Sequence, residues 1–344
     1  QAKNMSSNRR KLAKLKKKNV PSSVEDLIEK AQDLAQQGNV DLAEKYFVKA
    51  LEMEPNNVQA IDNYAYLLMD LDDFDKAKKL LERSVQLSPG GDYTKYLQLG
   101  QLYEGKQAVE CYSNAIKVML NVRQQYLDKI KMNNDQEAKQ GLELVCHEIA
   151  GAFCSVAEIY MTDSCFEDVA EKECGAALEQ AIQYDPNNFE VYQTLASYRI
   201  SQQNNEDALL QLRKSYSLWK DLPANELPGL VSYEFRHNTA KLFMELGDHN
   251  TAVDIWEQLV DEEENIAEVH YHLALAYRPL STTNAKESAS LARKLLVDSK
   301  CDDPELYKQI DTLLAELEKE NIEVLPEDNN NNNNIDDETM EIDK

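Results

Sequence analysis

Apolar residues recur along the chain at the spacing of amphipathic helices, in short blocks that come in pairs. The stretch "ALEMEPNNVQAIDNYAYLL", residues 50–68, joins two such blocks: Ala50 closes one, Pro55 follows it, and a new apolar series containing Ala65 begins. Only 10 glycines and 9 prolines occur in 344 residues, whereas a sandwich or barrel needs many tight turns. The pattern therefore predicts an all-α chain.

The paired blocks repeat with a period of about 34 residues, which is the tetratricopeptide period. Small residues are expected where the two helices of a unit cross, with a bulky residue between them. With units starting at Val24 and Val58, both proline positions align. The matching positions are Ala31, Ala43, Phe47, Ala50 and Pro55 in the first unit, and Ala65, Ala77, Leu81, Ser84 and Pro89 in the second.

Five further units continue the pattern less regularly. The third, "YLQLGQLYEGKQAVECYSNAI", has a shortened turn, and its second helix is expected to run on through "KVMLNVRQQYLDKIKMNN". The later units contain "SVAEIY", "YQTLASYRI", "NTAKLFMELGDHNTAVDIWEQL" and "YHLALAY", and "PELYKQIDTLLAELEKE" reads as a more polar capping helix. We therefore predict a tetratricopeptide superhelical solenoid of about seven repeats over residues 22–320, with an extended helix and irregular repeats around 104–175.

Charge divides the chain into three parts. The sequence has 37 Lys+Arg against 62 Asp+Glu, yet residues 1–20 hold eight basic side chains and no acidic one. Residues 1–21 are predicted to be a disordered basic head, and residues 321–344 an acidic, asparagine-rich disordered tail. A cationic run outside a folded body is a candidate nuclear-import signal. Its residues are Arg9, Arg10, Lys11, Lys14, Lys16, Lys17 and Lys18.

The composition also limits the function classes. The acidic body opposes nucleic-acid binding, leaving at most a weak RNA contact by the head. No run of eighteen apolar residues suggests a membrane span, and the first residues lack the apolar region of a secretory signal. The expected location is the cytoplasm and nucleus. No nucleophile motif, phosphate loop or metal-ligand spacing is present, so no enzyme activity, cofactor or metal is predicted.

In tetratricopeptide arrays the first helix of each unit lines a concave groove. Here the groove positions are mostly acidic, with tyrosine and methionine between them, although glutamate near a helix start also favours the helix dipole. Asp62, Glu104 and Glu158 are expected deeper in their helices, where the dipole does not explain them. Of the residues that clamp an acidic C-terminus in some arrays, only Asn63 is present. The candidate partner-binding residues are Asp62, Asn63, Tyr66, Met69, Glu104, Glu158, Glu190, Gln193, Glu234, His237, Glu268 and Tyr271.

An acidic tetratricopeptide array with a basic head and an acidic tail resembles the dedicated assembly chaperones of ribosomal proteins. Within them it is most similar to the fungal chaperones of universal large-subunit ribosomal protein four. The resemblance implies a monomer that binds one newly made basic client at its long internal loop, keeps it soluble and escorts it to nuclear pre-ribosomes. An import receptor would be a further partner. A scaffold in another nuclear or cytoplasmic complex is the alternative.

Overall fold

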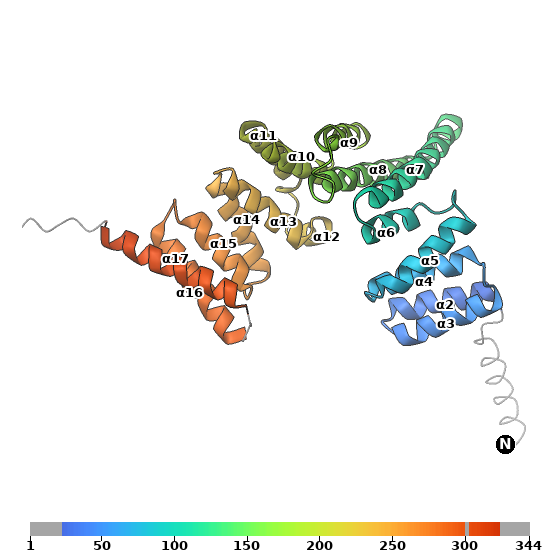
Figure 1. The fold of residues 1–344 in the computed structure, drawn as a ribbon, viewed down its shortest axis with the longest axis horizontal. Helices are drawn as coiled ribbons and strands as arrows, with labels where there is room; N and C mark the ends of the chain where they lie inside the picture. Colours follow the sequence, from blue (N-terminus) through green and yellow to red (C-terminus); the bar gives the residue numbers. More distant parts are fainter. Residues whose placement is uncertain (1–22, 300–302, 324–344) are drawn as a thin grey trace, which may run out of the picture. The chain divides into compact units, whose positions relative to one another are not determined.

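The computed structural model describes residues 23–299 and 303–323, and within these ranges it contains sixteen α-helices and no strand (Figure 1). The chain divides into two compact units, Gln1–Leu218 and Trp219–Lys344. The predicted all-α fold is therefore confirmed. Each unit consists of helices and the turns that join them within its described residues, and the single solenoid over residues 22–320 stays a prediction.

Unit 1 is built from five consecutive helix pairs, and each pair forms one repeat (Figure 1). The helices of the first four pairs pack against each other, and successive pairs also touch. In the fifth pair, Ser215 donates to the Phe189 carbonyl at 2.7 Å and Arg199 pairs with Asp207 at 2.7 Å. The pairs are α2 (Val24–Gln36) and α3 (Val40–Met53), α4 (Val58–Asp70) and α5 (Phe74–Leu87), α6 (Thr94–Leu102) and α7 (Gly105–Asn133), α8 (Gln136–Met161) and α9 (Ala170–Tyr184), and α10 (Phe189–Ser201) and α11 (Asn205–Trp219).

Unit 2 contains the remaining two repeats and a helix that covers their end. A four-residue helix, α12 (Leu227–Leu230), precedes them. The repeats are α13 (Tyr233–Glu245) with α14 (His249–Glu262), and α15 (Ala267–Tyr277) with α16 (Thr282–Ser299). The predicted capping helix is α17 (Pro304–Glu323), which buries Ile310, Leu313 and Leu317 against the last repeat. It extends three residues beyond the predicted limit at residue 320.

The small residues of the repeat pattern lie where the paired helices cross. Ala31, Ala43, Ala65 and Ala77 have no exposed surface, and the bulky Phe47 is only 1% exposed. A larger side chain at an alanine position would have to displace the neighbouring helix, because protein interiors are close-packed. The sequence pattern thus identified the residues that form the core.

The middle repeats differ from the rest because two of their helices are long. Helix α7 continues to Asn133, as predicted, and α8 begins at Gln136, so residues 105–161 form a long helical hairpin. The chain reverses at Asn134, which has a left-handed φ of 48°. The hairpin is held by close contact, since a Cβ at Gly141 would lie 2.5 Å from the Tyr126 ring.

Helix α8 is long and apolar enough to cross a membrane by length and composition. The sequence had suggested no such segment. The apolar residues Val145, Ile149 and Val156 are buried against neighbouring helices, and α8 packs on α7, α9 and α10. Burial of this kind is typical of a core helix. The basic head and most of the acidic tail lie outside the described residues.

Candidate partner-binding site

Eleven of the twelve candidate residues lie on first helices of their repeats, namely α4, α8, α10, α13 and α15. Glu104 is the exception. It was expected within a helix, but the first helix α6 ends at Leu102, and Glu104 lies in the turn before α7, where it is exposed. The shortened turn of the third repeat explains this error. It brings the start of the second helix, α7, to Gly105, so Glu104 falls directly before α7 and not within α6.

Asp62 is the most unusual candidate in unit 1. This α4 residue is only 6% exposed, and its Oδ1 atom has no hydrogen-bond partner. Burial raises the pKa of its carboxyl group, and a hydrogen bond from Ser84 and the charge of Lys95 oppose this only in part. Lys95 forms no ion pair with it, because its ammonium donates to the Ser84 carbonyl (3.4 Å), the Ser84 hydroxyl (3.3 Å) and the Ser88 carbonyl.

Tyr66 lies one helical turn after Asp62 on α4. Its hydroxyl donates to the Asp92 Oδ2 atom at 3.0 Å. Asp92 in turn caps α6, because its Oδ1 accepts from the backbone N–H and the hydroxyl of Thr94 at 3.0 and 2.8 Å. Burial raises the pKa of Tyr66, and the charges of Asp92 and Asp62 raise it further. Asn63 and Met69 are half-buried beside them, with Met69 packed on the core.

A second acidic pair lies further along unit 1. Glu158 of α8 and Glu190 of α10 are exposed by surface area, yet desolvation and then the Glu190 charge raise the pKa of Glu158. The nearby Thr194 hydroxyl, which donates to the Glu190 carbonyl at 3.1 Å, lowers the pKa of Glu158 in part. Among residues 23–299 and 303–323, neither carboxylate forms an ion pair. Gln193 is half-buried on the same face of α10.

The first helices of unit 2 carry polar residues that have partners. Arg236 of α13 is 1% exposed, and its guanidinium makes a two-pronged ion pair with Glu262 at 2.6 and 2.7 Å. His237 is also buried, and its Nδ1 accepts the indole N–H of Trp256 at 3.0 Å. Burial, followed by the charge of Lys241 and the neighbouring His272, lowers the pKa of His237 to about 4, so it is neutral near pH 7.

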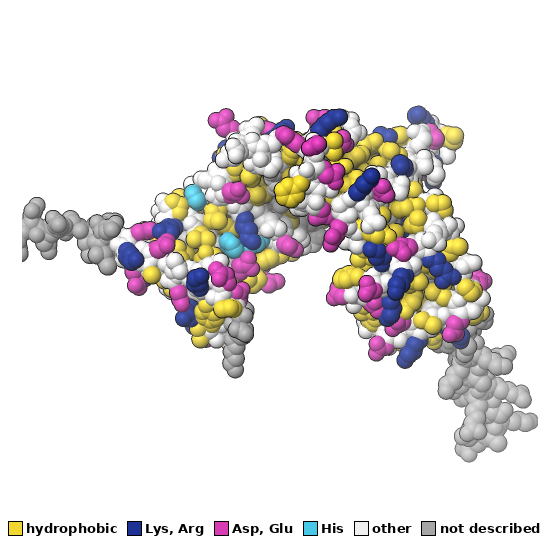
Figure 2. Space-filling view, in the orientation of Figure 1, with side chains coloured by type: hydrophobic (Ala, Val, Ile, Leu, Met, Phe, Trp, Pro, Cys, Tyr) yellow, Lys and Arg dark blue, Asp and Glu magenta, His cyan; other side chains and the backbone are white. Residues whose placement is uncertain are grey.

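The acidic candidates of unit 2 are exposed, and one has local partners. Glu268 of α15 lies 3.6 Å from the Lys241 ammonium and 3.8 Å from Nε2 of His237, whereas Glu234 is exposed in the first turn of α13. Tyr271 packs on the core that α15 forms with α16 and α17, so it also supports the fold. On the face drawn in Figure 2, acidic and basic side chains are interspersed over each unit.

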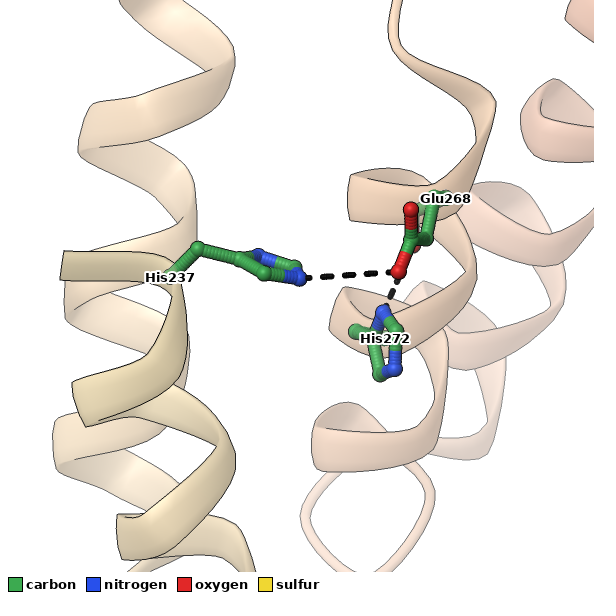
Figure 3. A group of neighbouring side chains, drawn as sticks. All are labelled: His237, Glu268 and His272. Atoms are coloured by element: carbon green, nitrogen blue, oxygen red, sulfur yellow. Dashed lines mark hydrogen bonds and ion pairs between the residues drawn. The ribbon is translucent and has the colours of Figure 1, made fainter. Parts of the chain in front are cut away.

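His237, Glu268 and His272 form the one group of possible metal ligands found in the described part of the chain (Figure 3). His272 fits the role, because its Nδ1 bonds the Glu268 carbonyl at 2.9 Å and leaves Nε2 free. His237 does not fit. Its Nδ1 accepts from Trp256, so the single proton of the neutral ring is on Nε2, the nitrogen that faces Glu268. Lys241 also competes for the Glu268 carboxylate.

Several partners of the candidate residues were not identified from the sequence. Asp92 lies in the turn before α6, and Lys95 lies in the first turn of that helix. Trp256 and Glu262 lie on α14, the second helix of its repeat. A repeat register predicts which residues of one helix face the groove. It does not predict which side chain of a neighbouring helix reaches them. His270 and His272 face different neighbours, since His270 Nε2 bonds the Glu264 carbonyl and the His272 ring contacts that of His237.

Comparison with known proteins agrees with this architecture. The tetratricopeptide repeat model matches residues 34–101. A solved structure titled Assembly Chaperone of RpL4 (Acl4) superimposes with a TM-score of 0.70 and 26% identity, covering 78% of this chain and all of that one. The fold is therefore that of tetratricopeptide repeats.

Two curated relatives carry the name "Probable assembly chaperone of rpl4". The one from Schizosaccharomyces pombe is 30% identical over 231 residues, and the one from Emericella nidulans is 28% identical over 259 residues. The matches cover 65% and 71% of this chain and span 65% and 62% of the relatives' own lengths. The expected resemblance to this group of chaperones is confirmed, and assembly chaperones are a non-enzymatic class.

Proposed function

We propose that this tetratricopeptide protein is a dedicated ribosome-assembly chaperone. Its client would be a newly made, basic large-subunit ribosomal protein, with protein four favoured by the names of its relatives. The protein would bind an extended basic segment of the client through the first helices of its repeats. It would keep the client soluble in the cytoplasm and accompany it to nuclear pre-ribosomes, as one chaperone with one client.

One observation carries this proposal: the first helices of unit 1 hold the carboxylates of Asp62, Glu158 and Glu190, which form no ion pair among the described residues. Asp62 is buried with an unsatisfied oxygen, and desolvation and then the Glu190 charge raise the pKa of Glu158. Removing charge from water without pairing it is costly. A lysine or arginine side chain from a client would relieve this cost and would at the same time be shielded from nonspecific contact with RNA.

The test is a titration of the extended basic loop of large-subunit protein four against the full chain. A matched variant reverses five first-helix acids to lysine: Asp62, Glu158, Glu190, Glu234 and Glu268. We expect binding that weakens as salt rises, with a residual apolar component, and a variant that loses several kcal/mol of affinity as the sum of many ion pairs. Equal affinities of the two folded proteins would refute the proposal. A scaffold for an apolar or acidic partner would show little salt dependence.

The route to the nucleus has its own test. Removal of residues 1–20 should reduce nuclear uptake of the chaperone and its client, since that segment holds the cationic run from Arg9 to Lys18. A chain that is retained in the cytoplasm only when the run is mutated would support an import signal. Unchanged uptake of both proteins would assign the head another role, without affecting the binding proposal.

A further inference from the structure

Asp62 is the described carboxylate whose surroundings most need an additional partner. Only 6% of its surface is exposed, and its Oδ1 accepts no hydrogen bond. In folded proteins nearly all buried polar atoms are paired, so an orphaned carboxylate oxygen on a partner-facing helix requires an explanation. The nearest cation, Lys95, cannot supply one because its ammonium is bonded to Ser84 and to the Ser88 carbonyl.

The neighbouring groups leave room for one more donor of a particular shape. Asp92 uses Oδ1 for two bonds from Thr94 and Oδ2 for one bond from Tyr66, so one acceptor position on Oδ2 is unfilled. Asp62 offers Oδ1, on the same side of α4 as the Tyr66 ring. Two acceptors on different carboxylates beside an aromatic ring suit a planar fork of N–H donors better than a compact ammonium.

Charge balance leads to the same ligand. Asp62 and Asp92 are two acids, and the enclosed Lys95 offsets one of them, so the group carries a net charge of about −1 when both acids are ionised. A single guanidinium would neutralise it. We propose that Asp62, Tyr66 and Asp92 form a subsite for one arginine side chain of an extended basic polypeptide. This inference rests on the proposed function, and it names the residue type that the chaperone selects.

Binding at this subsite has a structural requirement. The Asp62 Oδ1 atom is shielded from solvent in the free protein, so a side chain over it must shift to admit the guanidinium, and the proposal assigns this movement to the half-buried Tyr66, one turn along α4. Its hydroxyl would then exchange the bond with Asp92 for one with water. The free protein thus retains an unfavourable buried charge that the bound arginine removes. A residue kept for folding alone would do the reverse and stabilise the free protein.

The experiment compares two peptides and two variants of the full chain. The peptides are the loop used above and the same loop with every arginine replaced by lysine. The variants are Asp62→Asn and the control Asp70→Asn, which changes an exposed acid on the same helix α4. We expect Asp62→Asn to weaken binding of the arginine peptide about tenfold or more, and that of the lysine peptide much less. Asp70→Asn should leave both unchanged.

Thermal unfolding of the free proteins gives an independent readout. Asp62→Asn should melt at a temperature no lower than that of the wild type, because it removes a buried charge that lacks a partner. The subsite is refuted if Asp62→Asn binds the arginine peptide as the wild type does, if both peptides lose affinity equally, or if the variant is destabilised. If the wild type binds neither peptide, the proposed function itself fails. The two failures are therefore distinguishable.

Discussion

The first helices of the two units handle buried polar groups in opposite ways. In unit 1, Asp62 is enclosed with an oxygen that no donor reaches. In unit 2, Arg236 and His237 are enclosed to a similar degree, but the charge of Arg236 is paired with Glu262, although its Nε has no hydrogen-bond partner, and His237 accepts from Trp256. A buried group with its partners in place rigidifies the fold, whereas one without them is available to a ligand.

The two units also differ in how far the charge of their acidic residues is balanced by cations within the protein. Glu268 in unit 2 has Lys241 within 3.6 Å, so part of its charge is already balanced inside the protein. Glu158 and Glu190 in unit 1 form no ion pair among the described residues, and desolvation, followed by the Glu190 charge, raises the pKa of Glu158. Under the proposed function, an acid with a cation beside it therefore contributes less to binding of a basic client than an acid without one. The comparison predicts that unit 1 supplies most of the charge-dependent affinity.

The largest expected effect comes from replacing a buried alanine where two helices cross, because the fold depends on this close packing. Ala65→Arg or Ala196→Arg should abolish the cooperative fold, since both sites have 0% exposure and admit only a small side chain between helices. Circular dichroism would show loss of helix, whereas Gln32→Arg at an exposed position of α2 should keep the wild-type spectrum. Normal helix content and melting in either alanine variant would contradict the packing described above.

The next effect tests the paired character of unit 2. Glu262→Ala leaves the Arg236 guanidinium buried without its carboxylate, which should cost about 3–5 kcal/mol of unfolding free energy in urea titrations. Glu263→Ala, its exposed neighbour, is the matched control and should change stability by less than about 0.5 kcal/mol. Similar stabilities for the two variants would remove the contrast with Asp62.

A pH titration examines His237 separately. Its pKa is about 4 when folded against an ordinary value of 6.5, so the unfolded chain binds the proton more readily. Stability should therefore fall as pH decreases from about 6.5 to about 4, by up to about 3 kcal/mol from this group. Urea unfolding of the wild type and of His237→Gln at each pH would isolate the contribution. Parallel curves for the two proteins would show that His237 does not titrate in this way.

The smallest effects divide the acidic residues between the units. Neutralising Glu158 and Glu190 together to glutamine should weaken loop-peptide binding several-fold, because two unpaired charges are removed. Neutralising Glu234 and Glu268 should have a smaller effect, and Glu234→Ala alone should change the binding free energy by no more than about 1 kcal/mol. Anisotropy titrations at low salt would measure all three. A larger loss from the unit 2 pair would reverse the comparison.

The order of helices could be read from the sequence because the repeat pattern is local. Ala43 and Phe47 define the packing face of α3 by their spacing alone, and a helix that needs a neighbour for burial implies the next repeat. The extension of α7 was predicted on the same basis, since its apolar series continues without a breaking residue. The error at Glu104 arose where a shortened turn broke the period.

The sequence by itself determined the helical repeats, the small residues at their crossings and the acidic character of the first helices. Only the tertiary structure decided which acids have partners. Asp62 and Glu268 are both acids on first helices, but Lys95 is held by Ser84 and Ser88, whereas Lys241 reaches Glu268. Periodicity fixes the direction of a side chain from its own helix. Pairing also depends on the side chains that neighbouring helices and turns bring within a few ångströms, and these belong to no repeating pattern.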